Sequence, residues 1–194
     1  MGYWLFREVS DLTAALSGEE HMGIRNYLIE GVSGTGKTSV CHELRRRGHR
    51  ALNGDRDLAY KGDPVTGAPV QAPVDASDVD RVAWVHAHQI WDIRKVRSIV
   101  ADRSQAMSFL CGGSRNFAQF VDWFDDVFVL EIDRETLERR LDQRPDDEFG
   151  GRPEERALIL RLHTTREDVP QNAVAIDATA PLEQVVDEIL RRCS

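Results

Sequence analysis

The sequence predicts an α/β protein built on a central parallel sheet of about five strands. From Arg25 onward, strand-like and helix-like segments alternate, which is typical of a parallel sheet covered by helices on both faces. The segment 127–132 is apolar apart from Glu131, as expected for a strand buried on both faces. A glycine-rich turn joins the first strand to the first helix. We therefore expect three layers, helix–sheet–helix.

Each element follows from its local pattern. Gly48 ends the first helix, and Pro153 stands at an early position of a later one, where proline is favoured. The segment 61–78 is rich in Gly, Pro and Asp and is expected to be a loop. The predicted strands are 26–30, 49–53, 106–111, 127–132 and 173–176. The predicted helices are 39–47, 79–102, 117–123, 134–143, 153–167 and 181–192.

The glycine-rich turn reads GVSGTGKTS and fits G-x-x-x-x-G-K-[ST], the phosphate-binding P-loop. Its glycines let backbone N–H groups turn toward phosphate oxygens, and the following helix adds its positive N-terminal end. Lys37 would reach the β- and γ-phosphates, and the Thr38 hydroxyl would hold Mg²⁺. The residues predicted to bind the nucleotide are Gly31, Ser33, Gly34, Thr35, Gly36, Lys37, Thr38 and Ser39.

Two carboxylates, Asp55 and Asp57, follow the second strand. Residues two apart on an extended segment face the same way, so both are expected to point into the cleft. One would orient or deprotonate an attacking hydroxyl, and the other would hold Mg²⁺ through water or bind substrate hydroxyls. We assign catalysis and the metal to Asp55 and substrate binding to Asp57.

The third strand ends in Gly112, Gly113, Ser114 and Arg115. The paired glycines would let a substrate approach the backbone, and Arg115 would clamp a carboxylate or phosphate. The strand itself has no acidic residue, although nucleotide-dependent enzymes often carry one there. Metal binding is therefore expected from Thr38 together with Asp55 or Asp57.

A polar loop, 144–152, is expected to form a lid that closes over the triphosphate with arginines. Gly150 and Gly151 would be its hinge. We assign Arg140 and Arg144 to catalysis and Arg152 to substrate binding, although the sequence does not show which arginine is essential.

The predicted helix 79–102 carries two stripes of side chains. The aliphatic stripe is expected to face the core. The second stripe must be covered either by another element of the protein, such as the 61–78 loop, or by a substrate, and we favour packing against the protein. It consists of Trp84, His88, Trp91 and Lys95.

Composition narrows the class of protein. A net charge of -8 argues against a nucleic-acid partner. Cys41, Cys111 and Cys193 are odd in number and form no C-x-x-C pair, which predicts a reducing compartment without disulfides or a zinc site. The sequence shows no apolar run of about 20 residues and no signal-peptide pattern, so we expect a cytoplasmic protein with no membrane partner.

We divide the chain into an N-terminal extension, 1–24, and one domain, 25–194. Within the domain, the substrate-binding segment is about 55–104 and the lid about 140–153. The extension has three alternative roles: an accessory segment, a dimer contact, or sequence upstream of a start at Met22. Monomer and homodimer are both open.

From about residue 25 onward, the chain resembles P-loop small-molecule kinases of the adenylate kinase-like, shikimate kinase and gluconate kinase group. The resemblance departs from shikimate kinases at Ser114, where a third glycine would stand, and it lacks the gluconate kinase His-Phe lid sequence. It also lacks the Asp-Gly-Phe-Pro-Arg-like segment of nucleoside monophosphate kinases. Besides the P-loop, the matching segments are GDRDL (54–58), CGGSR (111–115), ERRLDQR (138–144) and AIDATAPLEQVV (175–186).

The resemblance implies the P-loop NTPase three-layer α/β/α fold with an arginine-bearing lid, and ATP and Mg²⁺ as cofactors. It implies transfer of the γ-phosphate to a hydroxyl, or a phosphate, of a small polar metabolite. Two alternatives are a kinase of a larger acceptor, such as a nucleic-acid 5′-end or an antibiotic, and a nucleotide-binding regulatory module without transfer chemistry. The sequence identifies neither the acceptor nor ATP over GTP.

Overall fold

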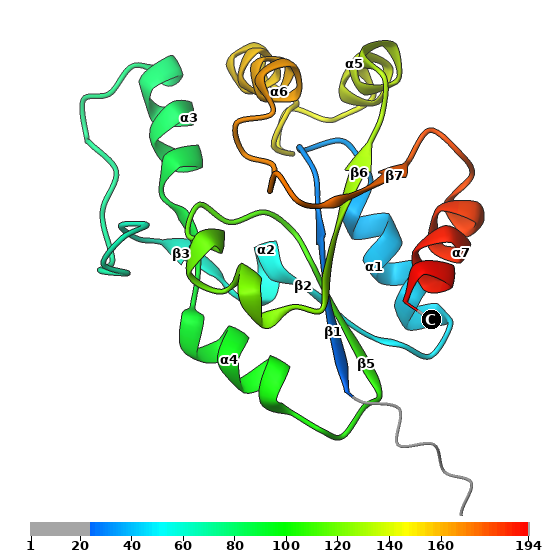
Figure 1. The fold of residues 1–194 in the computed structure, drawn as a ribbon. Coiled ribbons are helices and arrows are strands. Elements are labelled where there is room, and N and C mark those ends of the chain that lie inside the picture. The colour runs from blue at the N-terminus through cyan, green and yellow to red at the C-terminus, as the bar shows by residue number, and fades with distance from the viewer. Residues whose placement is uncertain (1–23, 194) are drawn as a thin grey trace, which may run out of the picture.

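The computed structural model describes residues 24–193 and confirms the predicted sheet (Figure 1). The predicted N-terminal extension lies outside the described residues apart from Ile24. Five parallel strands have the order β2-β5-β1-β6-β7. They are β1 (Arg25–Glu30), β2 (Arg50–Asn53), β5 (Met107–Cys111), β6 (Asp126–Glu131) and β7 (Val174–Asp177).

The central strand, β1, determines where the P-loop leaves the sheet. Leu28 of β1 lies opposite Leu110 of β5 and Val127 of β6. Every residue of β1 after Arg25 is buried. The chain therefore enters the P-loop from the middle of the sheet's carboxyl edge, where open parallel sheets bind ligands.

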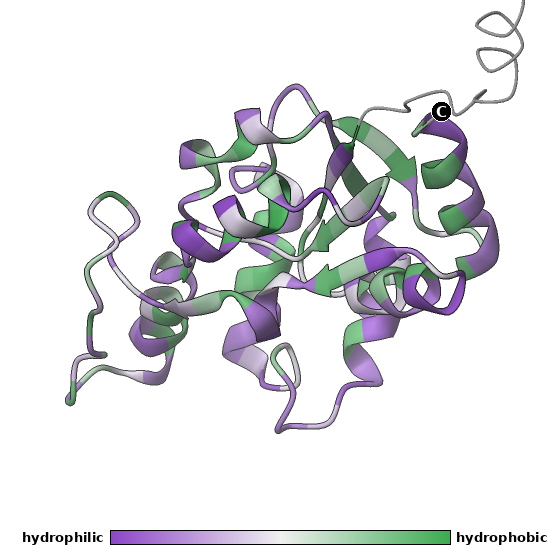
Figure 2. Cartoon of the chain, turned by 90° about the horizontal axis from the view of Figure 1, so that it is seen from below, coloured by the Kyte–Doolittle hydropathy of each residue, from purple (hydrophilic) through white to green (hydrophobic). Residues whose placement is uncertain are grey.

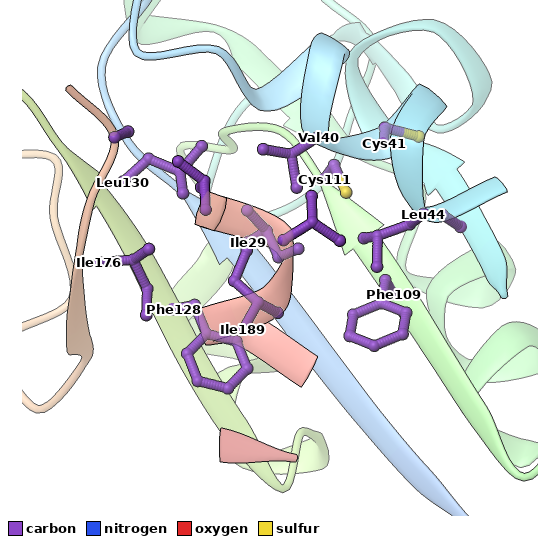
Figure 3. Close-up of a cluster of buried hydrophobic side chains, with 14 of the residues drawn as sticks. Ile29, Val40, Cys41, Leu44, Phe109, Cys111, Phe128, Leu130, Ile176 and Ile189 are labelled. Atoms are coloured by element: carbon purple, nitrogen blue, oxygen red, sulfur yellow. The ribbon is translucent and has the colours of Figure 1, made fainter. Parts of the chain in front are cut away.

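Helices cover both faces of the sheet, as predicted. On one face, α1 (Lys37–Arg46) and α7 (Leu182–Arg192) pack against strand residues such as Ile29 and Phe128, as Figure 3 shows. On the other face lie α4 (Ile93–Ala101) and two short 3₁₀ helices, η1 (Phe117–Gln119) and η2 (Val121–Trp123). Figure 2 shows hydrophobic strands surrounded by helices that carry hydrophilic residues. The three-layer architecture follows from the two apolar faces of the sheet.

Three further helices lie at the end of the sheet toward which β6 points (Figure 1). They are α3 (Asp78–Ala87), α5 (Arg134–Asp142) and α6 (Pro153–Thr165). The predicted lid loop connects α5 to α6. All three helices thus stand beside the carboxyl edge.

The prediction of one helix over 79–102 is wrong. The chain leaves α3 at Ala87, forms the short strand β4 (Gln89–Trp91) and resumes as α4. β4 pairs antiparallel with β3 (Ala59–Lys61). Tertiary contacts decide this, since the Trp91 N–H donates to Ser114 Oγ at 3.1 Å and to Asn116 Oδ1 at 3.0 Å. The Asp92 side chain then caps α4.

The second stripe expected on that helix is consequently not continuous. Trp91 is fully buried and its ring stacks on Phe120, with ring centroids 5.6 Å apart. Trp84 stacks instead on His88, with centroids 4.3 Å apart. The cover of Trp91 is therefore protein, in agreement with the packing alternative.

Candidate functional site

The P-loop adopts a backbone that requires its glycines. Gly31, Gly34 and Gly36 have φ values of 141°, 100° and 107°, a region that L side chains rarely adopt. A Cβ at Gly34 would lie 2.6 Å from Leu137 Cδ1. Since α1 begins at Lys37, the N–H groups of its first turn have no partner within the helix and are available to an anion.

Lys37 lies where the motif places it. Its Nζ donates to the carbonyls of Gly31 and, at 3.1 Å, Val32. Burial lowers the pKa of Lys37, while the charges of Asp55 and Glu30 oppose that effect. The ammonium is thus held inside the loop by groups that a phosphate would replace.

Asp55 and Asp57 do not face the same way, because the segment Gly54–Asp57 forms a helical turn, α2, rather than an extended strand end. Asp55 lines the cleft, and its Oδ1 accepts from the Gly113 N–H at 3.2 Å. The Asp57 carboxylate accepts from the Asn53 N–H at 3.1 Å and lies 3.6 Å from Arg45 Nη2. The structure thus separates the pair, and of the two only Asp55 lines the cleft.

The missing side chain at Gly112 makes room for Asp55 rather than for a substrate. Gly112 has a φ of 155°. A Cβ there would lie 2.8 Å from Asp55 Oδ1 and 2.8 Å from the Trp91 ring. Gly113 lines the cleft, whereas Gly112 lies behind Asp55. The paired glycines therefore make room for the carboxylate that the turn positions.

Two of the three assigned lid arginines contact the P-loop. Arg140 donates to the carbonyls of Gly34 (3.3 Å) and Thr35 (3.1 Å) and to Ala178 O (2.9 Å). Arg144 Nη1 donates to Ser33 Oγ at 2.9 Å and to Phe149 O. Arg152 is exposed at the N-cap of α6 and lies outside the lining of this cleft. The structure thus distinguishes arginines that the sequence could not.

Two cavities meet at this edge of the sheet. The first, of about 500 Å³, is lined by residues 33–39 of the predicted nucleotide segment, by Arg140 and Arg144, and by the turn after β7 that includes Ala178 and Ala180. Gly31, which was also predicted to bind the nucleotide, is not among its lining residues. The second, of about 340 Å³, lies on the α3 side. Lys37 and Asp55 line both. A group held in the second cavity would therefore lie next to phosphates held in the first.

The second cavity contains three ionisable residues that we did not assign from sequence. Glu30 ends β1 and is 3% exposed. His86 Nε2 lies 2.8 Å from Asp168 Oδ2, and Arg115 pairs with Asp168 Oδ1. Of the three, only Glu30 could have been noticed in the sequence, because it is a charged residue at the end of a strand, directly before the P-loop. The other two come together through the packing of α3 against α6.

The comparisons with known proteins agree with this geometry. An AAA domain family model matches residues 28–161, which is more than half of the chain. The chain belongs to the AAA domain family. Among curated protein sequences, none matches it.

Solved structures show the fold of this AAA domain protein. A sugar kinase from Janibacter sp. HTCC2649 is 20% identical, with a TM-score of 0.53, over 87% of this chain and 94% of that one. A shikimate kinase from Acinetobacter baumannii is 16% identical, with a TM-score of 0.56, over 89% of this chain and 94% of that one. A gluconokinase from Sinorhizobium meliloti 1021 is 19% identical, with a TM-score of 0.50, over 86% of this chain and 90% of that one. The predicted fold, that of P-loop kinases, is confirmed.

The residues of this AAA domain protein fit a magnesium–nucleotide complex. Thr38, in the first turn of α1, is exposed to the first cavity, and Asp55 faces it from α2. Within residues 24–193, no group of three or more His, Cys, Asp or Glu side chains could hold a metal. Mg²⁺ commonly uses one or two protein ligands together with phosphate oxygens and water. Thr38 and Asp55 would be the two protein ligands at this site.

Glu30 is expected to make stability depend on pH. Burial raises its pKa from 4.5 to about 8, although Lys37 and Arg115 act to lower it. Between these values the folded state keeps a proton that the unfolded state releases, so stability falls as pH rises, by up to about 1.4 kcal/mol per unit. The substitution Glu30→Gln removes this pH-dependent contribution to stability. Denaturant unfolding at pH 5, 6.5 and 8 should show wild type losing stability relative to the variant.

The control for this measurement is Glu167→Gln, which changes an exposed glutamate bonded to Arg161. Its free energy of unfolding, plotted against pH, should run parallel to that of wild type. Parallel curves for wild type and Glu30→Gln would contradict the prediction.

Proposed function

We propose that this protein is an ATP-dependent phosphotransferase that moves the γ-phosphate to a hydroxyl of a small polar metabolite. The observation that carries the proposal is the position of Asp55, beside Lys37 at the junction of the two cavities. A small-molecule kinase needs a carboxylate at the place where its phosphate donor and its acceptor meet. The sugar, gluconate and shikimate kinase neighbours support the reaction class by analogy of fold.

The first cavity would hold the nucleotide. Backbone N–H groups of the P-loop and Lys37 would bind the β- and γ-phosphates, and the turn containing Ala178 and Ala180 would contact the base. Thr38 and Asp55 would hold Mg²⁺, which neutralises charge on the phosphates. Arg140 and Arg144 already lie against the loop and would stabilise charge that develops during transfer.

The second cavity would hold the acceptor. The Gly113 N–H fixes the Asp55 carboxylate at the junction. From there Asp55 would take the proton of the acceptor hydroxyl while that oxygen bonds to the γ-phosphorus and the bond to ADP breaks. The other residues of the site would contribute to catalysis by positioning the reactants and by stabilising charge in the transition state.

We propose a cytoplasmic protein without a membrane partner, in keeping with the three buried free cysteines. In the part of the chain that the structure describes, no helix could cross a membrane. The proposal includes a monomer or a homodimer, and residues 1–24 as a separate extension.

The proposed function is tested by ADP release with Mg-ATP across sugar acids, polyols, amino sugars, nucleosides and nucleoside monophosphates. Turnover that depends on one acceptor class would establish the kinase. ATP binding with no ADP formed from any acceptor would favour the regulatory alternative instead. Activity on an oligonucleotide 5′-end would favour the larger-acceptor alternative.

The lid arginines give a second test. Arg144→Gln should lower kcat by about 10- to 100-fold, because it removes a cation that touches Ser33 of the P-loop. Arg152→Gln is the matched control, since Arg152 lies outside both cavities, and it should leave kcat unchanged. Steady-state kinetics at saturating ATP measures both. An equal loss in the two variants would contradict the assignment.

A further inference from the structure

The charged and polar groups around the second cavity point to a particular class of acceptor. This inference rests on the proposed function, because it treats that cavity as the acceptor site. Three carboxyl groups line it, from Glu30, Asp55 and Asp168. The permanent cations among its described lining residues are Lys37 and Arg115. Lys37 faces the phosphate side and is needed there.

Arg115 is already bound inside the protein. Its guanidinium pairs with Asp168, and only 15% of its side chain is exposed. The other oxygen of Asp168 lies 2.8 Å from His86 Nε2. The pKa of Asp168 lies below its ordinary value, because His86 and Arg115 outweigh the raising effect of burial. The expected clamp for a carboxylate or phosphate is therefore occupied by an internal carboxylate.

Three separate parts of the chain build this bridge. His86 comes from α3, Arg115 from the turn after β5, and Asp168 from the segment after α6. The Arg115 N–H also donates to Gln89 O at 2.9 Å, which fixes that turn to β4. An anionic acceptor that binds Arg115 would have to compete with Asp168, whose charge already offsets that of the largely enclosed guanidinium.

The cavity offers hydrogen-bond acceptors rather than free cations. Glu30 Oε1 is buried without a hydrogen-bond partner, and Glu30 lines the cavity. A buried unpaired carboxyl oxygen is unfavourable until a donor reaches it. The lining also includes apolar side chains, those of Val85, Phe149, Ile159, Leu162 and Val169.

We propose that the acceptor is a polyhydroxy compound that carries no anionic group and presents hydroxyl or ammonium donors to Glu30, and that Asp168 excludes anions by holding Arg115. The volume of about 340 Å³ is near the lower end for small-molecule sites, so the acceptor is small. This class excludes sugar acids and monophosphates.

The test measures binding without transfer, so that it stands whether or not any acceptor is phosphorylated. The protein is loaded with Mg²⁺ and a non-hydrolysable ATP analogue. Isothermal titration then compares three probes with one carbon skeleton: glucitol, its amine glucamine and its acid gluconate. Wild type should bind gluconate more weakly than the other two. Gluconate binding as tight as glucitol binding would overturn the inference.

Asp168→Asn is the deciding variant. It frees Arg115 without changing the size of the side chain, so gluconate should bind at least about tenfold tighter than to wild type, as expected for one charged hydrogen bond. Glu167→Gln removes a neighbouring charge that bonds Arg161 instead and should change nothing. No gain in Asp168→Asn would overturn the proposal, even if a kinase activity is found.

Arg115→Gln keeps the test decisive if Asp168→Asn does not fold. It leaves Asp168 without its cation, so glucamine should bind about tenfold tighter. Unchanged glucamine binding would overturn the proposal. Absence of ADP release with every acceptor would count against the phosphotransferase alone.

Discussion

Lys37→Ala is expected to lower kcat/KM for phosphoryl transfer by at least about 10³-fold, equivalent to roughly 4 kcal/mol of transition-state stabilisation. The ammonium is already enclosed by the P-loop, where it donates to the carbonyls of Gly31 and Val32. In that low-dielectric position a cation acts strongly on charge that develops between the β- and γ-phosphates. Steady-state kinetics with the acceptor found in the ADP-release panel measures the loss.

Lys95→Ala provides the matched control. Lys95 is exposed and donates to the backbone carbonyl of Asp57, outside the cleft. Its substitution should leave kcat/KM near the wild-type value. Both variants should unfold cooperatively on heating, which shows that they are folded. Near-normal turnover in Lys37→Ala would make the assignment of this loop wrong.

Asp55→Asn is expected to lower kcat by about 10²- to 10⁴-fold, the range for loss of a general base. Asparagine can still accept the Gly113 N–H, so the turn should stay in place. It cannot take a proton, and it brings no charge to Mg²⁺. The effect should fall on kcat rather than on KM for the acceptor, because the lost interaction belongs to the transition state.

Asp57→Asn is the control that the helical turn supplies. Asp57 lies two residues away but bonds the Asn53 N–H and Arg45, not the cleft. Its kcat should remain close to wild type. Raising the Mg²⁺ concentration separates the two roles of Asp55: rescue would mean that metal binding dominates, whereas no rescue is expected for a base. Equal losses in both variants would contradict the placement of Asp55.

The nucleotide side of the site could be predicted from the sequence because its residues are consecutive. A loop that wraps a phosphate needs glycines, one lysine and one hydroxyl at fixed spacing, and the structure shows Gly31, Gly34 and Gly36 with the required positive φ. The five strands of the sheet were also predictable, since strand-like segments alternate with helix-like segments along the chain.

The interruption of the helix predicted over 79–102 could not be read locally. α3 and α4 are both amphipathic, so helical spacing continues across the strand between them. Strand β4 exists because β3 pairs with it and because Ser114 and Asn116 bond Trp91. These partners lie more than twenty residues from Trp91 in the sequence.

The sequence by itself determined the fold class, the P-loop and the residues that would hold phosphate, because local spacing encodes them. The folded structure decided which acidic and basic groups line the two cavities. It turned Asp57 away through a helical turn, placed Arg152 at a helix cap, and joined Arg115 to Asp168. Charge at a site depends on which side chains meet, and these come from distant segments brought together by packing.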